Sequence, residues 1–263
     1  MSLQHLYLQE IQQELQKPQQ APQRISHEQL AALPALLQTY LHKAGFVGAP
    51  LSTNFCLEWE NTHLKLEPEK DWMHIDCSQF NTAAPPTRIA LMQSKMLGFV
   101  PFAGRDKYQN SEGNMLIKLA NFTVSNTKGP EMNVSALVTF LSESVLLPAA
   151  LLEQYTRWRQ LDAYTLEATI TDAGISATGR FYFDENGLPY KFETADRFYS
   201  TGGEQHRRYP WTAYYMDYKS LDGLYLPSKL KAAWQLPNGE YTYFTGNIKS
   251  ITYGIEDVSQ INV

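Results

Sequence analysis

Hydrophobic and polar residues alternate along most of the chain, and this alternation predicts a mainly β protein. Strand-like segments form two series, one from Asn54 to Val124 and one from Ala163 to Tyr253. Short turn sequences separate the strands, including Asn-Gly at 186–187 and 238–239. About eleven strands joined in this way indicate a large antiparallel sheet, because parallel strands need longer crossovers. A sheet of this size tends to curl, so we expect a half-barrel within an α+β fold.

Three other segments have the spacing of helices. Leu8, Ile11 and Leu15 predict a short amphipathic helix, followed by a linker rich in Gln and Pro. Further helices are predicted at 34–44 and at 133–147, the latter with Asn133 as its cap. Both are expected to cover the concave side of the sheet. We therefore divide the chain into an N-terminal helix and linker at 1–25, one β-rich domain at 26–255 and a C-terminal tail at 256–263.

The helix at 133–147 and the uncharged segment behind it, LLPAALL, allow two interpretations. Its apolar residues recur at helical spacing, and Pro148 stops or kinks it. It is either a structural cover that closes one end of the sheet or a movable lid over an apolar cavity. The candidate lid and pocket residues are Leu137, Phe140, Leu141, Val145, Leu147 and Leu151, together with Trp211 and Tyr243 from aromatic-rich strands.

Acidic and basic residues stand side by side within two predicted strands, at Arg105-Asp106 and Asp196-Arg197. Neighbours in a strand point to opposite faces, so one residue of each pair faces inward and needs a partner there. One interpretation is a cross-strand ion network that holds the architecture. The other makes Arg105 or Arg197 the anchor for an anionic head group. The candidate acid or base groups of an enzyme would then be Glu131, Glu143, Asp106 and Asp196.

Composition limits the class of protein. With 263 residues and 43% apolar content the chain can bury the core of a single domain. The net charge is −5 and the basic residues are scattered, which argues against a nucleic-acid partner. No apolar run approaches the roughly 18 residues of a spanning helix, and no secretory signal is evident. We expect a soluble, cytoplasmic chain, or a periplasmic or membrane-associated one if an N-terminal segment was removed; the oligomeric state stays open.

The familiar chemical motifs are missing. There is no HExxH, CxxC, GxSxG or phosphate-binding loop, so we predict no metal and no cofactor. A turn at EPEK would place His63 opposite His74, but two imidazoles are fewer ligands than a zinc site uses. Cys56 and Cys77 lie in neighbouring predicted strands, so a disulfide and two free thiols are both open.

An ordered set of short motifs resembles an uncharacterised bacterial family known as a domain of unknown function. The motifs are GRDKYQNSEGNMLIKL, GPEM, FLSE with LLPAALL, FYFDENG, ADRFY and AWQLPNGEYTYFTG, and the resemblance runs from about Leu33 to Tyr253. It implies no established activity, but many members look as if they carry an N-terminal membrane segment. The expected architecture also resembles the half-barrels of bacterial lipoprotein carriers, an analogy of fold that transfers no function.

These observations favour a carrier or binding protein for an apolar or amphipathic ligand, such as a lipid or acyl chain, held under a helical lid. One alternative is a hydrolase or isomerase that uses carboxylates beside an arginine, for which a small cavity with converging carboxylates would be the mark. Another is a structural or interaction module without a ligand.

Overall fold

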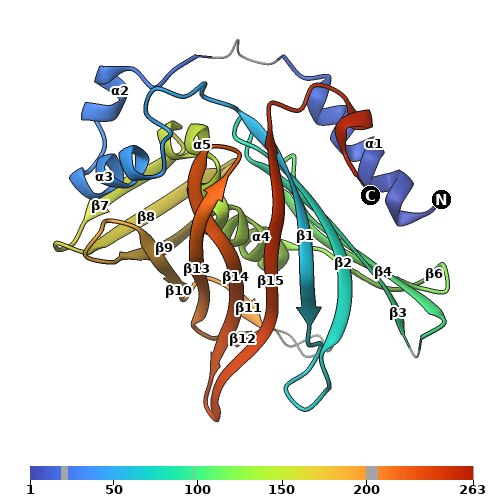
Figure 1. Cartoon of the computed structure of the whole chain (residues 1–263). Helices are drawn as coiled ribbons and strands as arrows, with labels where there is room; N and C mark the ends of the chain where they lie inside the picture. The colour runs from blue at the N-terminus through green and yellow to red at the C-terminus, as the bar shows by residue number, and fades with distance from the viewer. Residues whose placement is uncertain (19–22, 97, 200–206, 263) are drawn as a thin grey trace.

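A thirteen-stranded antiparallel sheet curves around a central helix in the computed structural model, which describes residues 1–18, 23–96, 98–199 and 207–262 (Figure 1). The strand order is β6-β5-β4-β3-β2-β1-β15-β14-β13-β10-β9-β8-β7. The first six strands are β1 (Asn54–Leu64), β2 (Met73–Thr82), β3 (Thr87–Met96), β4 (Val100–Gln109), β5 (Glu112–Leu119) and β6 (Phe122–Thr127). The others are β7 (Thr156–Gln160), β8 (Thr165–Asp172), β9 (Ile175–Phe183), β10 (Pro189–Thr194), β13 (Trp211–Leu221), β14 (Leu224–Leu236) and β15 (Gly239–Tyr253).

The predicted mainly β fold with one large curved antiparallel sheet is confirmed, but the number of strands is larger than expected. A turn at Ala120 and Asn121, both with positive φ, splits one predicted strand into β5 and β6. The short strand β7 was not predicted. Asp196 and Arg197 lie between β10 and the small hairpin of β11 (Phe198–Tyr199) and β12 (Arg207–Arg208), not inside one strand as expected.

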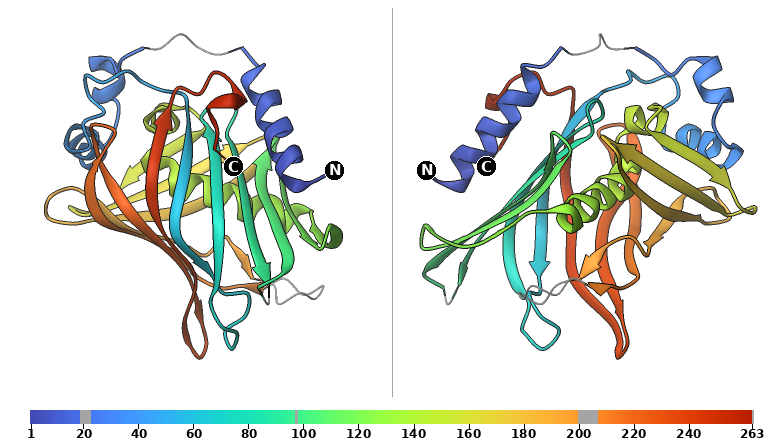
Figure 2. Two further views of the ribbon diagram at one scale, coloured as in Figure 1. Left: turned by 45° about the vertical axis from the view of Figure 1, so that its right-hand side comes forward. Right: turned by 180° about the vertical axis from the view of Figure 1, so that it is seen from behind.

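The helical insertion connects the two edges of the sheet. The chain leaves edge strand β6, forms α4 (Pro130–Glu143), η1 (Ser144–Leu146) and α5 (Pro148–Leu152), and enters the opposite edge strand β7. Helix α4 contacts β4 and β5 on one side and β9 on the other, and it fills the concave side of the sheet (Figure 2). An insertion between two strand series in the sequence therefore becomes a brace across the half-barrel.

The predicted start and cap of this helix were wrong. Helix α4 begins at Pro130, with Gly129 as its N-cap residue at φ 115°, a backbone conformation that favours glycine. Proline suits the first helical turn because the amide it lacks would have no partner there. Asn133 lies within the first turn, and its side-chain oxygen accepts a hydrogen bond from the Gly113 amide at 2.8 Å. The helix also ends at Glu143 and does not continue to residue 147.

Tyrosine hydroxyls bind the free carbonyls at the C-terminal end of α4 and η1. Tyr215 donates to the Ser142 carbonyl at 2.5 Å, and Tyr253 donates to that of Leu146 at 2.7 Å. Tyr40, from α3 (Ala35–Lys43), donates to the Val145 carbonyl at 2.6 Å. Burial raises the pKa of all three phenols, which keeps them protonated as donors. These bonds satisfy carbonyls that a helix end leaves without partners, and they fasten it to the sheet and to α3.

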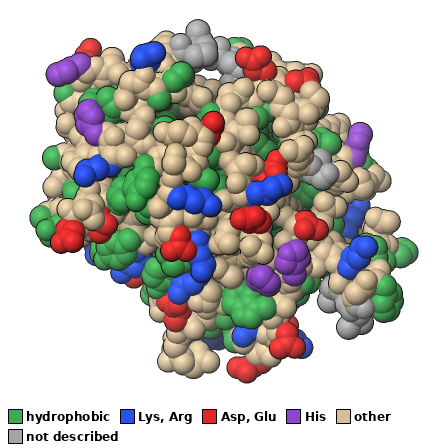
Figure 3. Space-filling model, in the orientation of Figure 1, with side chains coloured by type: hydrophobic (Ala, Val, Ile, Leu, Met, Phe, Trp, Pro, Cys, Tyr) green, Lys and Arg blue, Asp and Glu red, His purple; other side chains and the backbone are tan. Residues whose placement is uncertain are grey.

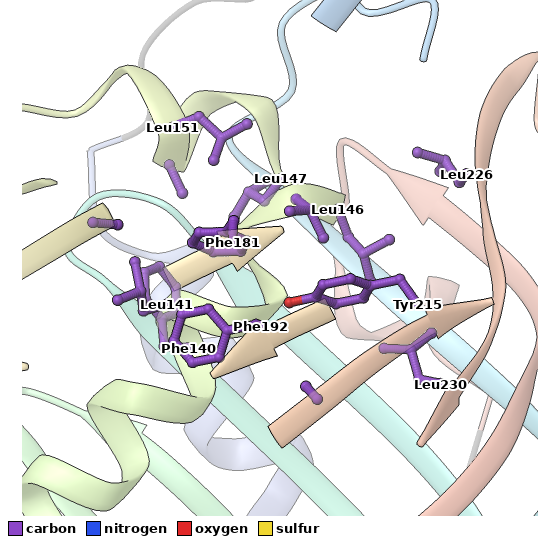
Figure 4. Packing of buried hydrophobic residues seen from close by; sticks show 14 of the residues in the cluster. Phe140, Leu141, Leu146, Leu147, Leu151, Phe181, Phe192, Tyr215, Leu226 and Leu230 are labelled. Atoms are coloured by element: carbon purple, nitrogen blue, oxygen red, sulfur yellow. The ribbon is translucent and has the colours of Figure 1, made fainter. Parts of the chain in front are cut away.

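The main core lies between α4, α5 and the strands β8–β10 and β13–β15. Phe140 and Leu141 of α4 pack there near Phe181 and Phe192, below Leu146 and Leu147 (Figure 4). Every side chain of α4 from residue 135 to residue 143 is buried, including those outside the apolar stripe. The helix is therefore enclosed on all sides, which is more than the one-sided contact that its apolar stripe predicts.

The N-terminal helix α1 (Leu3–Leu15) packs on the convex face of the sheet, against β3 and β4 (Figure 2). It covers a second, smaller core together with the C-terminal tail. Glu10 of α1 is buried and forms ion pairs with Arg105 at 3.3 Å and Lys107 at 2.7 Å. The remaining helix of the N-terminal region is α2 (His27–Ala31). Among the described segments, each helix is too short or too polar to cross a lipid bilayer.

Candidate functional site

A cavity of about 130 Å³ lies between α4 and the concave face of the sheet. It separates the polar edge of the helix from strands β1–β5 and β13–β15. Its apolar wall includes Trp59, Leu64, Met92, Met115, Leu230 and Phe244. Its polar wall includes Gln79, Arg88, Asp106, Thr139, Ser142, Glu143 and Arg197. Apolar surface predominates with a few polar groups, a composition typical of small-molecule sites.

Arg197 forms the cationic wall of the cavity. Its guanidinium lies over the ring of Trp211 at 4.5 Å and near that of Trp234 at 5.7 Å. It also donates a hydrogen bond to the hydroxyl of Thr139 on α4. The aromatic rings are fixed in turn, because the Trp211 indole donates to the Tyr243 hydroxyl at 3.0 Å. No carboxylate in the described part of the chain lies within ion-pair distance of Arg197, so its positive charge faces rings, a hydroxyl and the cavity.

A buried ion network closes the other side of the cavity. The Arg88 Nε donates to both carboxylate oxygens of Glu143, at 3.0 and 2.8 Å, and its Nη1 donates to Asp106 Oδ2 at 2.8 Å. Gln79 and Asn81 donate to Glu143 Oε2 at 2.7 and 3.1 Å. Burial by itself would lower the pKa of Arg88, but Glu143 and Asp106 more than offset this and raise it above its usual value. The network joins the last residue of α4 to β2, β3 and β4.

Two buried polar atoms of cavity-lining residues lack hydrogen-bond partners within the described chain. They are the indole nitrogen of Trp59, a donor, and the Oδ1 oxygen of Asp106, an acceptor. Native proteins leave few such atoms unsatisfied, since each costs about 1–3 kcal/mol. A ligand that carries both an acceptor and a donor could recover that free energy.

The structure brings some of the residues predicted from sequence to this cavity and leaves others elsewhere. Arg197, Trp211, Tyr243, Asp106 and Glu143 all line it. The apolar lid candidates do not line it and lie in the buried core: Leu137, Phe140, Leu141, Val145, Leu147 and Leu151. Helix α4 turns its polar residues Thr139, Ser142 and Glu143 to the cavity.

The remaining candidates lie away from the cavity. Arg105 is on the convex face with Glu10, which follows from its position next to inward-facing Asp106. Glu131 is in the first turn of α4. Asp196 accepts the Thr178 amide at 2.8 Å and lies within 3.5 Å of Arg208.

Sequence reasoning missed Arg88, although a signal for it exists. Arg88, Ala90 and Met92 alternate along β3, and all three line the cavity. The two-residue period shows that they share a face. It could not show that this face is the concave one, because Ile89 and Leu91 form an apolar row on the other face under α1.

Cys56 and Cys77 are free thiols. They lie on opposite faces of the sheet, Cys56 in the small core under α1 and Cys77 at the cavity, so they cannot form a disulfide in this fold. The predicted pairing of His63 with His74 is confirmed by the register of β1 and β2, with ring centroids 5.4 Å apart. No group of three potential metal ligands is found among the described residues.

The thiols provide a test of how tightly α1 covers the small core. Burial raises the pKa of both Cys56 and Cys77 to about 12. Thiolate is the reactive form, and at pH 8 its population falls roughly a thousandfold relative to an ordinary cysteine. We expect Cys56, which is buried, to react with Ellman's reagent about a thousandfold more slowly in the native protein than in urea, and Cys77, which is half-buried, to be slowed less. Fast labelling of Cys56 in the native state would show that the α1 interface opens readily.

Oppositely charged side chains are interspersed on the outer face of β13–β15 and β1–β2 (Figure 3). Lys231 pairs with Glu240 at 2.8 Å, and Lys249 pairs with Glu58 at 3.0 Å. This face therefore carries no single-sign field.

Comparisons with known proteins give a family and two structural similarities. The model of a family of unknown function, DUF6544, matches residues 23–246. Among curated proteins, none matches the sequence. A LolA superfamily protein from Nitrosomonas europaea is similar in structure at a TM-score of 0.41, with 12% identity, over 86% of this chain and 97% of that one. A domain described as an outer membrane lipoprotein-sorting protein from Vibrio parahaemolyticus gives a TM-score of 0.44, with 14% identity, over 76% of this chain and 85% of that one.

Proposed function

We propose that this chain, which belongs to the DUF6544 family, binds an amphipathic small molecule with an anionic group between α4 and the concave face of the sheet. The observation that carries the proposal is Arg197, a cation held on Trp211 beside an apolar cavity, with no carboxylate paired to it in the described chain. An anionic group would pair with the guanidinium while the apolar part of the ligand fills the cavity.

The size of the cavity limits what the closed protein can hold. Pockets for drug-sized ligands are about 300–1,000 Å³, whereas an apolar cavity of about 150 Å³ holds one benzene. The cavity here is about 130 Å³, so it accommodates the equivalent of one ring or a short alkyl segment. A long acyl chain would have to extend past half-buried residues at the cavity wall, such as Leu64 and Phe244.

Binding explains the cavity better than catalysis does. A small cavity with converging carboxylates was the mark of the hydrolase or isomerase alternative, and Asp106 and Glu143 do converge here. Both carboxylates, however, are held by Arg88, and both oxygens of Glu143 already accept hydrogen bonds. A general base needs a lone pair directed at its substrate. Of the four oxygens of these two carboxylates, only Asp106 Oδ1 accepts no hydrogen bond from a described residue, so one oxygen is left for catalysis in place of a pair of free carboxylates.

Calorimetric titration with straight-chain alkanoates, from butanoate to hexadecanoate, tests the proposal. Each added methylene should raise the affinity about fourfold until the cavity is full, because burying one CH₂ contributes about 0.8 kcal/mol. Arg197→Met should weaken binding about tenfold or more, since a hydrogen bond to a charged group contributes about 1.5–3 kcal/mol.

Arg208→Met is the matched control, because Arg208 is exposed, carries the same charge and does not line the cavity. It should leave the affinity unchanged. The proposal fails if no alkanoate binds, or if the two arginine variants bind equally well. Affinity that continues to rise through the longest chains would show that α4 moves to admit them.

A further inference from the structure

Two neighbouring hairpins end in exposed aromatic residues. Phe99, in the turn between β3 and β4, is 74% exposed, and Phe122, at the turn between β5 and β6, is 78% exposed. Val124 on β6 is 59% exposed. Large apolar side chains are seldom left this open in clusters on a protein without an apolar partner.

These side chains lie at one end of the sheet. Strands β4 and β5 pair with Phe102 opposite Leu119, so the two turns emerge together. The Ala120 amide also donates to the Pro101 carbonyl at 2.8 Å, which ties one turn to the other. Figure 2 shows these hairpin ends projecting past the body of the protein, away from α3. We call the surface formed by Phe99, Phe122 and Val124 the hairpin-tip surface.

The tips of the two hairpins carry basic residues and no acidic ones. Neither the segment 91–104 nor the segment 115–130 contains an aspartate or a glutamate. Lys95 is exposed beside the first turn, and Lys118 is half-buried beside the second, where it donates to the Met1 carbonyl at 3.0 Å. Glu67, Asp71 and Asp76 border the same hollow as Lys95, so the positive charge is local to the two tips. Aromatic side chains next to lysines complement a surface that is apolar below and anionic above.

We propose that the hairpin-tip surface docks on an anionic lipid bilayer, with Phe99 and Phe122 in the interface and Lys95 and Lys118 at the head groups. Aromatic rings favour the membrane–water interface, and each lysine near an anionic leaflet adds about 1 kcal/mol of attraction. The proposal does not depend on the ligand of the cavity.

The geometry favours a bilayer over a second copy of the chain. Another strand would pair along the edge strand β6, but Phe99 belongs to the β3–β4 turn, which is separated from that edge by β5. A flat surface can contact both turns at once. The adjacent β1–β2 hairpin carries Glu67, Glu69 and Asp71, which an anionic surface repels, so the contact is confined to the hairpin-tip surface.

Vesicle flotation with the full chain tests this inference. We expect binding to vesicles of equal parts phosphatidylcholine and phosphatidylglycerol, and at least tenfold weaker binding to phosphatidylcholine alone. The variant Phe99→Ser/Phe122→Ser should lower the partition coefficient on the anionic vesicles at least tenfold. Salt near 1 M, where the screening length is about 3 Å, should weaken the binding of the wild type.

The control variant is Tyr190→Ser/Tyr225→Ser, which removes two aromatic residues exposed elsewhere on the sheet. It should float like the wild type. The inference is overturned if the wild type binds neither vesicle, or if the two double variants lose binding equally. It is also overturned if sedimentation velocity finds a dimer that Phe122→Ser dissociates while lipid binding is unchanged, because the surface would then join two copies.

Discussion

Replacing Leu141 by glutamate is expected to lower the free energy of unfolding by about 5 kcal/mol or more. Leu141 is 1% exposed, and it packs in the main core on a helix that is buried on all sides (Figure 4). The substitution removes apolar contacts and places a carboxylate among the apolar side chains of the main core. Domains are stable by only about 5–15 kcal/mol. In a urea titration, much of this variant should therefore already be unfolded in buffer without urea.

Leu66→Glu is the control for this substitution, because Leu66 lies in the β1–β2 turn and is 50% exposed. It should change the stability by less than about 0.5 kcal/mol. If Leu141→Glu instead melted close to the wild type and lost only alkanoate binding, α4 would be a movable lid. The three tyrosine bonds to the end of the helix would then contribute little to holding it.

Replacing Arg88 by methionine is expected to destabilise the protein by about 3–5 kcal/mol, measured as the free energy of unfolding in urea. Methionine is apolar and flexible, so the main loss is the ion network and not the packing. Glu143 and Asp106 would remain in the interior without their cation. Leaving buried charges uncompensated costs far more than a surface ion pair contributes.

Arg159→Met provides the comparison, since Arg159 pairs with Glu167 but its side chain is 70% exposed. This variant should lose no more than about 1 kcal/mol. The double variant Arg88→Met/Glu143→Gln should be more stable than Arg88→Met, because it removes one of the uncompensated charges and keeps an acceptor for Gln79 and Asn81. If the double variant were the less stable one, the network would act through packing and not through charge.

Much of the fold was predictable because its signals are local. Alternation identified the strands, and Asn-Gly turns identified hairpins such as the one between β14 and β15. The four-residue turn EPEK correctly placed His63 opposite His74. The start of α4 was missed although Gly129-Pro130 carries its signal, because Asn133 offered a competing cap.

The candidate site was predictable only in part. Alternation correctly required one of Arg105 and Asp106 to face inward, and the network that holds Asp106 is a cross-strand one, as one interpretation predicted. Its cation, Arg88, was not named. The lid residues were sought on the apolar stripe of the helix, but the cavity faces the polar edge of α4.

The sequence by itself determined most of the strands and helices, the register of the β1–β2 hairpin and which neighbours share a face, since these depend on backbone periods of a few residues. Only the tertiary structure decided that Glu143 meets Arg88 across 55 positions, that tyrosines from α3, β13 and β15 bind the end of α4, and that Arg197 lies on Trp211. These contacts depend on how far the sheet curls around α4. That curvature results from the packing of the whole core, and no local pattern encodes it.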